Sequence, residues 1–439
     1  MHCLVERGPL LVAVKTASKL ITPDCYSGPT CGRVVLRHHQ QHLLHVASTN
    51  VTTHLDFYIP ANFENTDRPI ATKSKEWAYL LKNMVDTPLV SIMSQMIDGM
   101  ATNTAMVNNA QFPDEGDIDW EDHELEPSSP LAIVRIDALQ RALQVSKDFS
   151  SRNLEVRCFG VHIEAVLGAG LRFVATNGHC MSLFDMQNGL YSMNDEQMPV
   201  FIEYPCVSTV LACLDLWEGV DPNEVDCEIR VVKRTHTHED GEVRELFPVV
   251  IFDIAGCGYR ARITTAMPSS FVDFRQVLKG ADESFIEVTT QRVALQELCE
   301  WAVKQSGRKK SKVVFKFLPE APSAAGYIGL SVGYASDKRD AAKVPLTRRD
   351  LVPYQLPSAT RVVNGGLAQP AEGFESPDTN IITVDADYVL DMLRHLHDEE
   401  VVLRFHGMVD LIEVLGTSTV DPCYFVCMPI YQQVEEDAL

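Results

Sequence analysis

The sequence lacks the features that mark several common classes of protein. It contains no CxxC pair and no glycine-rich phosphate loop, and no apolar run reaches the ~18 residues that a membrane-spanning helix needs. Its first residues do not form a signal-peptide pattern, because Glu6 and Arg7 interrupt the short apolar stretch. We therefore expect a cytoplasmic protein that needs no membrane, no cofactor and no metal.

A positive net charge is also missing. The chain has 60 acidic and 38 basic residues, a net charge of −22. Because phosphate affinity comes from counterions released at Lys and Arg, this charge argues against a protein that coats DNA by overall attraction. Any DNA binding must be local or topological. The length of 439 residues and the 46% hydrophobic content predict about three domains of ordinary size.

Cysteine and histidine raise the question of disulfides or a metal site. The chain has twelve cysteines, and most of them lie in apolar stretches, so we expect reduced core residues: Cys158, Cys206, Cys213, Cys299 and Cys427. The histidine-rich run Arg37–His45 joins two β-like runs, Val34–Leu36 and Leu43–Ala47. This arrangement favours a polar hairpin tip over a metal site.

The same two helical patterns occur three times along the chain. In the first pattern a short strand runs into an amphipathic helix, and it starts at Val5, Val134 and Val288. In the second a helix is followed by a polar turn and an alternating strand, and it starts at Trp77, Val207 and Tyr388. The two patterns begin 72, 73 and 100 residues apart, so the third repeat carries an insertion.

The segments between these patterns place the domain boundaries. The insertion, residues 335–379, is rich in Pro, Gly, Asp and Arg and is typical of a long exposed loop. An acidic stretch at about 113–130 indicates a linker between repeats one and two. We predict an α+β fold of three tandem similar domains, 1–127, 128–279 and 280–439, each with two helices packed on antiparallel sheet.

Several segments, in the right order on this repeat, resemble the bacterial DNA polymerase III β subunit, the sliding clamp family. They are Val5–Leu11, Arg172–His179, Phe271–Leu278, and the closing pair Asp387–Leu393 and Tyr424–Ile430. The chain is identified as a divergent member of that family. Its divergence and its enlarged third repeat fit a clamp encoded by a phage, a plasmid or a distant bacterial lineage.

The resemblance implies a non-catalytic processivity factor. Two subunits would close head to tail into a ring around duplex DNA, with twelve helices lining the hole, and would contact phosphates without reading sequence. The implied partners are a second copy of the chain, double-stranded DNA, the replicative DNA polymerase, the clamp loader and other proteins with clamp-binding motifs.

The resemblance also assigns three sets of residues. The pocket for partner peptides would be lined by Thr176, Gly178, His179, Cys180, Met181, Val272, Val277, Val426, Cys427, Met428, Pro429 and Ile430. The DNA-facing basic residues would be Lys15, Lys19, Lys73, Lys75, Lys82, Arg141, Lys147, Arg152, Arg292, Lys304, Arg308, Lys309, Lys310 and Arg394. The dimer interface would include Leu80, Leu81, Trp301 and Val303.

The chain departs from the family at the rim of the expected pocket. Val272 replaces a proline, and three positions that are usually basic hold Cys180, Gln276 and Tyr431. These changes leave the identity of the bound peptide open. An acidic tail, residues 432–439, follows the last strand, and one hypothesis is that it shields the pocket.

Two other interpretations start from different features. An enzyme could hold Mg²⁺ on the acidic cluster formed by Asp114, Glu115, Asp117, Asp119, Glu121 and Asp122. These carboxylates crowd one linker, however, so a solvated linker is the better interpretation, and no nucleophile motif stands beside His179 to make it a general base. A protein-binding scaffold of three repeats would share the fold, and only ring closure and DNA retention would distinguish it from a clamp.

Overall fold

The computed structural model describes most of the chain in 25 segments. They are residues 1–20, 33–40, 42–50, 52–66, 69–72, 74–84, 87–97, 100–108, 110–113, 130–153, 158–166, 170–187, 190–191, 199–237, 243–267, 271–278, 286–305, 312–317, 326–333, 350–354, 362–363, 366–367, 381–406, 410–418 and 422–429. The acidic linker 114–129 and the tail 432–439 lie outside them.

The chain divides into two compact units. Unit 1 comprises residues 1–147, 159–172 and 186–271, and unit 2 comprises 148–158, 173–185 and 272–439. Unit 1 therefore holds most of the first two repeats and unit 2 holds the third. The segment 173–185 belongs to unit 2 although it lies within the expected second domain, so the three-domain division stays a prediction.

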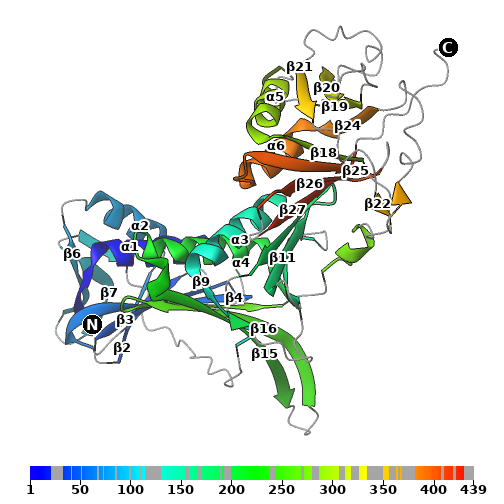
Figure 1. Ribbon diagram of the computed structural model, residues 1–439. Helices are drawn as coiled ribbons and strands as arrows, with labels where there is room; N and C mark the ends of the chain where they lie inside the picture. Colours follow the sequence, from blue (N-terminus) through cyan, green and yellow to red (C-terminus); the bar gives the residue numbers. More distant parts are fainter. Residues whose placement is uncertain are drawn as a thin grey trace. The chain divides into compact units, whose positions relative to one another are not determined.

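Unit 1 is built on a long antiparallel sheet to which repeats one and two both contribute (Figure 1). Its strands run in the order β13 (Leu190–Tyr191), β9 (Ala132–Arg135), β15 (Val225–Thr237), β16 (Val243–Gly256), β17 (Tyr259–Ala266), β4 (Thr53–Asn65), β1 (His2–Glu6), β6 (Leu89–Ile97), β7 (Met100–Val107) and β8 (Ala110–Pro113). A branch holds β2 (Val34–His39), β3 (Leu43–Thr49) and β5 (Ile70–Thr72). In the same unit β10 (Gly160–Val166) pairs with β14 (Val200–Glu203).

The two repeats meet where β4 pairs with β17, with Tyr58 opposite Arg260 and Asp56 opposite Arg262. Side chains alternate between the two faces of a strand. In β4 the apolar Leu55, Phe57 and Ile59 are buried, while the polar side chains between them stay partly exposed. One face of the sheet is therefore core and the other is polar.

Helices cover the core face. They are α1 (Arg7–Leu20), α2 (Ser74–Asn83), α3 (Ile136–Phe149) and α4 (Tyr204–Leu214). Buried residues recur every three to four positions along α1, which predicts one apolar stripe. The Ser48 hydroxyl of β3 donates to the Ala17 carbonyl of α1 at 3.3 Å, and the Thr16 hydroxyl donates to the Ala212 carbonyl of α4 at 3.3 Å. These bonds tie α1 to the sheet and to the helix of the next repeat.

Unit 2 contains two antiparallel sheets and a helix pair. The first sheet has the order β12 (Cys180–Met186), β27 (Cys423–Cys427), β26 (Ile412–Gly416), β25 (Glu400–Phe405) and β18 (Ile286–Gln291). The second has the order β21 (Asp350–Tyr354), β20 (Gly326–Gly333), β19 (Lys312–Phe317) and β24 (Ile381–Asp385). Helix α5 (Arg292–Gln305) contacts α6 (Ala386–His395), and β11 (Gly170–Thr176) contributes residues to both units.

The structure confirms the repeated patterns. The strand-then-helix pattern appears as β1–α1, β9–α3 and β18–α5, and the helix-then-strand pattern appears as α2–β6, α4–β15 and α6–β25. The interpretation of 335–379 as a loop was incomplete, because this segment contains β21, β22 (Val362–Val363) and β23 (Gly366–Leu367). Strand β21 pairs with β20 and so extends the second sheet of unit 2.

The cysteine and histidine predictions were largely correct. The ten cysteines in the described ranges are free thiols, and all but Cys257 are buried. The histidine-rich run does form the β2–β3 hairpin. His45 lies in the second strand, within the predicted run Leu43–Ala47; it is fully buried, and its ring nitrogens contact Arg37 and Asp56.

Candidate functional sites

The turn between β11 and β12 presents His179 on a rigid backbone. The Asn177 side-chain oxygen accepts hydrogen bonds from the backbone N–H groups of His179 and Cys180, both at 2.9 Å. The Thr176 hydroxyl donates to the Cys180 carbonyl at 2.7 Å and accepts from the Gly178 N–H at 3.1 Å. Gly178 has a φ of +88°, a conformation that side chains disfavour, which accounts for glycine at this position.

This turn lies against the end of β27, as the resemblance predicts. The Met428 N–H donates to the His179 carbonyl at 2.8 Å, and Cys180 lies opposite Cys427 in the β12–β27 pair. The structure therefore brings Thr176–Met181 together with Val426–Pro429. The His179 ring also stacks on Tyr388 of α6, with 6.0 Å between centroids. The sequence match covered Tyr388 but assigned it no role.

Part of the predicted lining was wrong. Cys180, Met181, Val426 and Cys427 are buried in the centre of the sheet, so their side chains pack in the core and are not open to a peptide. Burial raises the pKa of the Cys180 thiol to about 12, so this thiol is not reactive at neutral pH. The exposed members of the set are Gly178, His179, Val277 and Met428.

Val272, Val277, Pro429 and Ile430 complete the predicted lining. Val272 and Val277 flank a short 3-10 turn, Phe274–Gln276, with Val277 exposed. Among the interactions of the described residues, none joins this turn to His179. Pro429 is half-buried, while Ile430 and Tyr431 lie outside the described residues.

Acidic residues of α6 and its N-cap lie near His179 and Tyr388. Burial raises the pKa of Tyr388, and the negative charges of Asp385 and Asp387 act in the same direction. Burial also raises the pKa of Asp391, although Arg394 is paired with it at 2.9 Å and opposes this shift. The surroundings of Tyr388 are therefore acidic.

The predicted DNA-facing residues mostly lie at helix surfaces. Exposed members are Lys15, Lys19, Lys82, Arg152, Lys304 and Arg394, and half-buried ones are Arg141, Lys147 and Arg292. Arg292 is occupied by the Asp398 carbonyl and the Gln296 side chain, both at 2.9 Å. The side chain of Lys75 and all of Lys73, Arg308, Lys309 and Lys310 lie outside what the structure describes.

The helices differ in charge from the rest of the chain. Helices α1 to α6 contain ten basic and seven acidic residues, a net charge of +3, whereas the whole chain carries −22. Helix α1 contributes most, because Arg7, Lys15 and Lys19 have no acidic neighbour within it. Positive charge is therefore concentrated on the helices of an acidic protein.

The predicted dimer contact needs one correction. Leu81 is 0% exposed and packs in the core of unit 1, so it is not available to a second subunit. Leu80 and Val303 are half-buried, and the side chain of Trp301 lies outside the described part of the structure. The exposed aromatic residue of α2 is Tyr79, at 68%. Tyr79 directly precedes Leu80 in α2, and this position in the helix is the signal that could have identified Tyr79 as a candidate contact residue.

The acidic cluster on which the enzyme interpretation rests lies outside the described residues. The pentapeptide Gly329–Gly333 fits the GxSxG pattern, but Ser331 lies within β20, opposite Val314 of β19, and not at a strand-to-helix turn. Within the described ranges, no group of three or more His, Cys, Asp or Glu residues could hold a metal ion. A search of the same residues finds no helix that could span a membrane.

Comparisons with known proteins identify the fold. The sequence matches no family model, and no curated protein matches it. Solved structures do match: a Caulobacter crescentus β sliding clamp has a TM-score of 0.71 at 16% identity, with 98% of this chain and 99% of that chain covered. The Thermotoga maritima DNA polymerase III β subunit gives 0.69 at 14%, covering 98% and 100%, and the Pseudomonas aeruginosa subunit gives 0.68 at 16%, covering 98% and 100%. The chain therefore has the β-clamp fold, with a match that covers 98% of it.

Proposed function

We propose that this protein is a sliding clamp, a non-catalytic ring that encircles duplex DNA and tethers a replicative polymerase. The observation that carries the proposal is the fold match over 98% of this chain and 99% of a β sliding clamp. A ring requires a heterologous contact that closes after two subunits, and we propose that α2 with Tyr79 and Leu80 meets α5 with Val303.

The charge distribution supports DNA binding inside such a ring. A protein of net charge −22 repels DNA at long range, but the helices alone carry +3. In a β clamp these helices line the hole, so the exposed Lys15 and Lys19 would face phosphates. Phosphate contacts carry no base information, and binding should therefore be sequence-independent and salt-sensitive.

The His179 turn is the proposed docking site for partner peptides. His179, Tyr388 and Met428 would form its exposed surface, an aromatic and aliphatic platform suited to one or two bulky anchors. The acidic Asp385, Asp387 and Asp391 near it would favour peptides with basic flanking residues. Clamp loader, polymerase and other motif-bearing proteins would share this surface.

Ring formation is the first test. Negative-stain electron microscopy of the purified protein should give two-dimensional averages of closed rings with six-fold pseudo-symmetry and a hole wide enough for a duplex. Solid globular particles at micromolar concentration would contradict the proposal. The Tyr79→Arg variant should convert rings into single subunits, because it places a charge at the proposed contact.

DNA contact is tested separately by salt titration. The double variant Lys15→Gln with Lys19→Gln should lower the slope of log affinity against log salt by about two, since each phosphate contact contributes ~0.9. Lys233, an exposed lysine on β15 outside the helices, is the matched control, and Lys233→Gln should leave the slope unchanged. Equal slopes for both variants would argue against a DNA-facing α1.

A further inference from the structure

Unit 1 has a cleft on the polar face of its sheet, opposite the helices. It lies where the β2–β3 turn and the β16–β17 turn come together, and its volume is about 270 Å³. Its lining is mainly polar or aromatic: His39, Gln40, Leu43, Tyr58, Gly258, Tyr259, Arg260 and Arg262. In a chain with 60 acidic residues, this cleft is lined by two arginines and no carboxylate.

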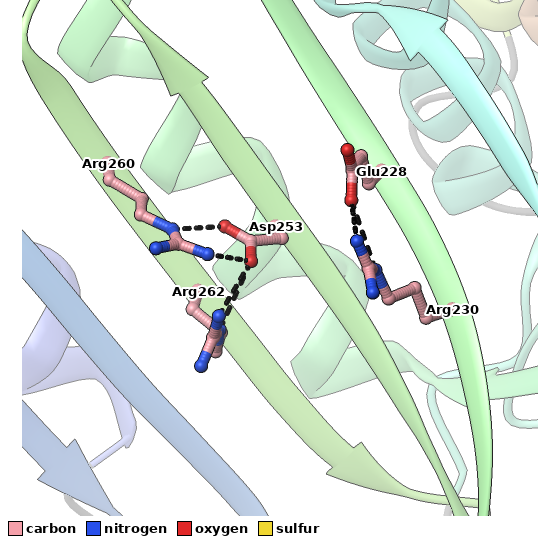
Figure 2. A network of polar contacts seen from close by, with 5 residues as sticks. All are labelled: Glu228, Arg230, Asp253, Arg260 and Arg262. Carbon is pink, nitrogen blue, oxygen red and sulfur yellow. Dashed lines mark hydrogen bonds and ion pairs between the residues drawn. The ribbon is translucent and has the colours of Figure 1, made fainter. Parts of the chain in front are cut away.

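A buried carboxylate beneath the cleft holds both arginines (Figure 2). Asp253 of β16 is 8% exposed, and it accepts hydrogen bonds from Arg260 Nε at 2.7 Å and from Arg262 Nη2 at 2.9 Å. Burial alone would raise the pKa of Asp253, but the hydrogen bonds from the two arginines outweigh it and lower this pKa. Asp253 therefore stays charged and fixes both guanidinium groups.

The arginines keep donors for a ligand. Each uses Nε and Nη2 toward Asp253, and neither Nη1 group has a partner among the described residues. Their side chains are 46% and 35% exposed. Two fixed guanidinium groups on one strand face can each direct N–H groups at the oxygens of one phosphate.

Aromatic rings form the other wall. Tyr58 stacks on His45 with 4.9 Å between centroids and 11° between planes, and His39 lies 4.8 Å from Tyr58. His45 is itself held between Arg37 Nε at 2.7 Å and Asp56 Oδ1 at 2.8 Å. The ring stack is therefore rigid before any ligand arrives, so binding against it costs little side-chain entropy.

We propose that this cleft binds a nucleotide unit, with the phosphate on the Nη1 groups of Arg260 and Arg262 and the base against Tyr58, His39 or Tyr259. Paired arginines with stacking rings suit this chemistry, because a base has a flat face for the rings and a phosphate has several acceptor oxygens. An acidic peptide would use the arginines but not the ring wall. The volume is close to the ~300 Å³ at which ligand pockets commonly start, so the cleft has room for part or all of one nucleotide.

The source of the nucleotide is either a free nucleoside phosphate or one residue of single-stranded DNA. Titration of the full-length protein with deoxythymidine monophosphate tests the first, and fluorescence anisotropy with a labelled oligo-dT strand tests the second. Binding of the monophosphate identifies a site for free nucleotides, and binding of the strand alone identifies a single-strand site. Either result supports the proposal, provided that it depends on the arginines.

Arg260→Gln should weaken that binding about ten-fold or more, because it removes one of the two charges that contact phosphate. Arg262→Gln should weaken binding in the same way. It provides a second test in case the Arg260 variant does not fold. The matched control is Arg230→Gln: Arg230 pairs with Glu228 on the same polar face but does not line the cleft (Figure 2).

Three results would overturn the proposal. The first is no binding of either probe, and the second is an equal loss of affinity in the Arg230 and Arg260 variants. The third is that a poly-glutamate peptide displaces the nucleotide at a concentration lower than that of the nucleotide. The double variant Lys15→Gln with Lys19→Gln should not alter binding of the monophosphate. The proposal for the cleft can therefore be contradicted while the proposal that α1 contacts DNA is confirmed, and the reverse is also possible.

Discussion

Each unit has a buried carboxylate that is paired with hydrogen-bond donors, and the two carboxylates differ in the kind of partner that surrounds them. Asp253 lies on β16 in unit 1, and Glu413 lies on β26 in unit 2, where it is 4% exposed. Each is surrounded by donors from neighbouring strands. The partners of Asp253 are two exposed arginines, whereas Glu413 accepts from the Tyr424 hydroxyl at 2.5 Å and lies 3.1 Å from the buried His406 ring.

The exposure of the side chains that surround each carboxylate decides whether the cluster can also bind a ligand. Around Glu413, the His406 side chain is buried, Tyr424 is half-buried, and Arg404, 3.7 Å away, is partly exposed. Burial strongly raises the pKa of Tyr424, and its hydrogen bond to Glu413 adds to this shift, so Tyr424 remains a donor. Because the carboxylate and the imidazole of this cluster are both buried, we expect it mainly to stabilise the sheet. The arginines on Asp253 face outward and retain donors, so that cluster can also bind.

The largest effect is expected from Glu413→Ala. Removing the carboxylate takes away the acceptor of the half-buried Tyr424 hydroxyl and the charge beside the buried His406 ring, which should cost on the order of 3 kcal/mol in the free energy of unfolding. Urea denaturation monitored by circular dichroism measures the change. If the urea midpoint shifts no more than it does for a substitution at an exposed position, the cluster adds no stability.

A smaller loss is expected from Asp253→Ala, about 1 to 2 kcal/mol, because the freed arginines can rotate into water. The same variant should loosen both guanidinium groups and so weaken nucleotide binding at the cleft. Denaturation and nucleotide titration of one sample measure the two effects. A loss of stability larger than that of Glu413→Ala would reverse the comparison between the clusters.

Acid should affect both clusters in the same direction. Burial raises the pKa of Glu413, but its contacts with His406 and Tyr424 outweigh burial, so its pKa, like that of Asp253, is lowered in the folded protein. A lowered carboxyl pKa contributes stability above the unfolded value, about 4, and this stability is lost as the pH falls through the folded pKa.

Glu413→Gln should therefore make stability less dependent on pH below about 4, since the glutamine does not titrate. The measurement is a series of urea midpoints between neutral and acidic pH for the variant and the unmodified chain. Parallel curves would mean that Glu413 has the same pKa in the folded and unfolded chain.

The smallest effect is expected from Arg230→Gln, less than about 0.5 kcal/mol. Arg230 and Glu228 form a partly exposed pair on one strand, and such pairs contribute little in water. Thermal unfolding compares this variant with Asp253→Ala. A large loss here would mean that surface pairs on the polar face stabilise the sheet as strongly as the buried carboxylates.

Much of the fold could be predicted from local sequence patterns. The three strand–helix pairs and three helix–strand pairs were correct because each depends on hydrophobic spacing within about twenty residues. The segments around His179 and Met428, which the resemblance assigns to one pocket, lie side by side in the structure. The burial of Cys180, Met181 and Val426 was missed, because alternation along a strand shows which residues share a face but not whether both faces are covered.

The sequence alone determined the repeat, the apolar stripe of each helix and the concentration of basic residues on α1. Tertiary structure decided that β4 of the first repeat pairs with β17 of the second, placing Tyr58 opposite Arg260. It also decided that Asp253 lies under two arginines and that Leu81 belongs to the core. These features depend on the register between strands and on packing between distant segments, which non-local burial selects and which no local pattern encodes.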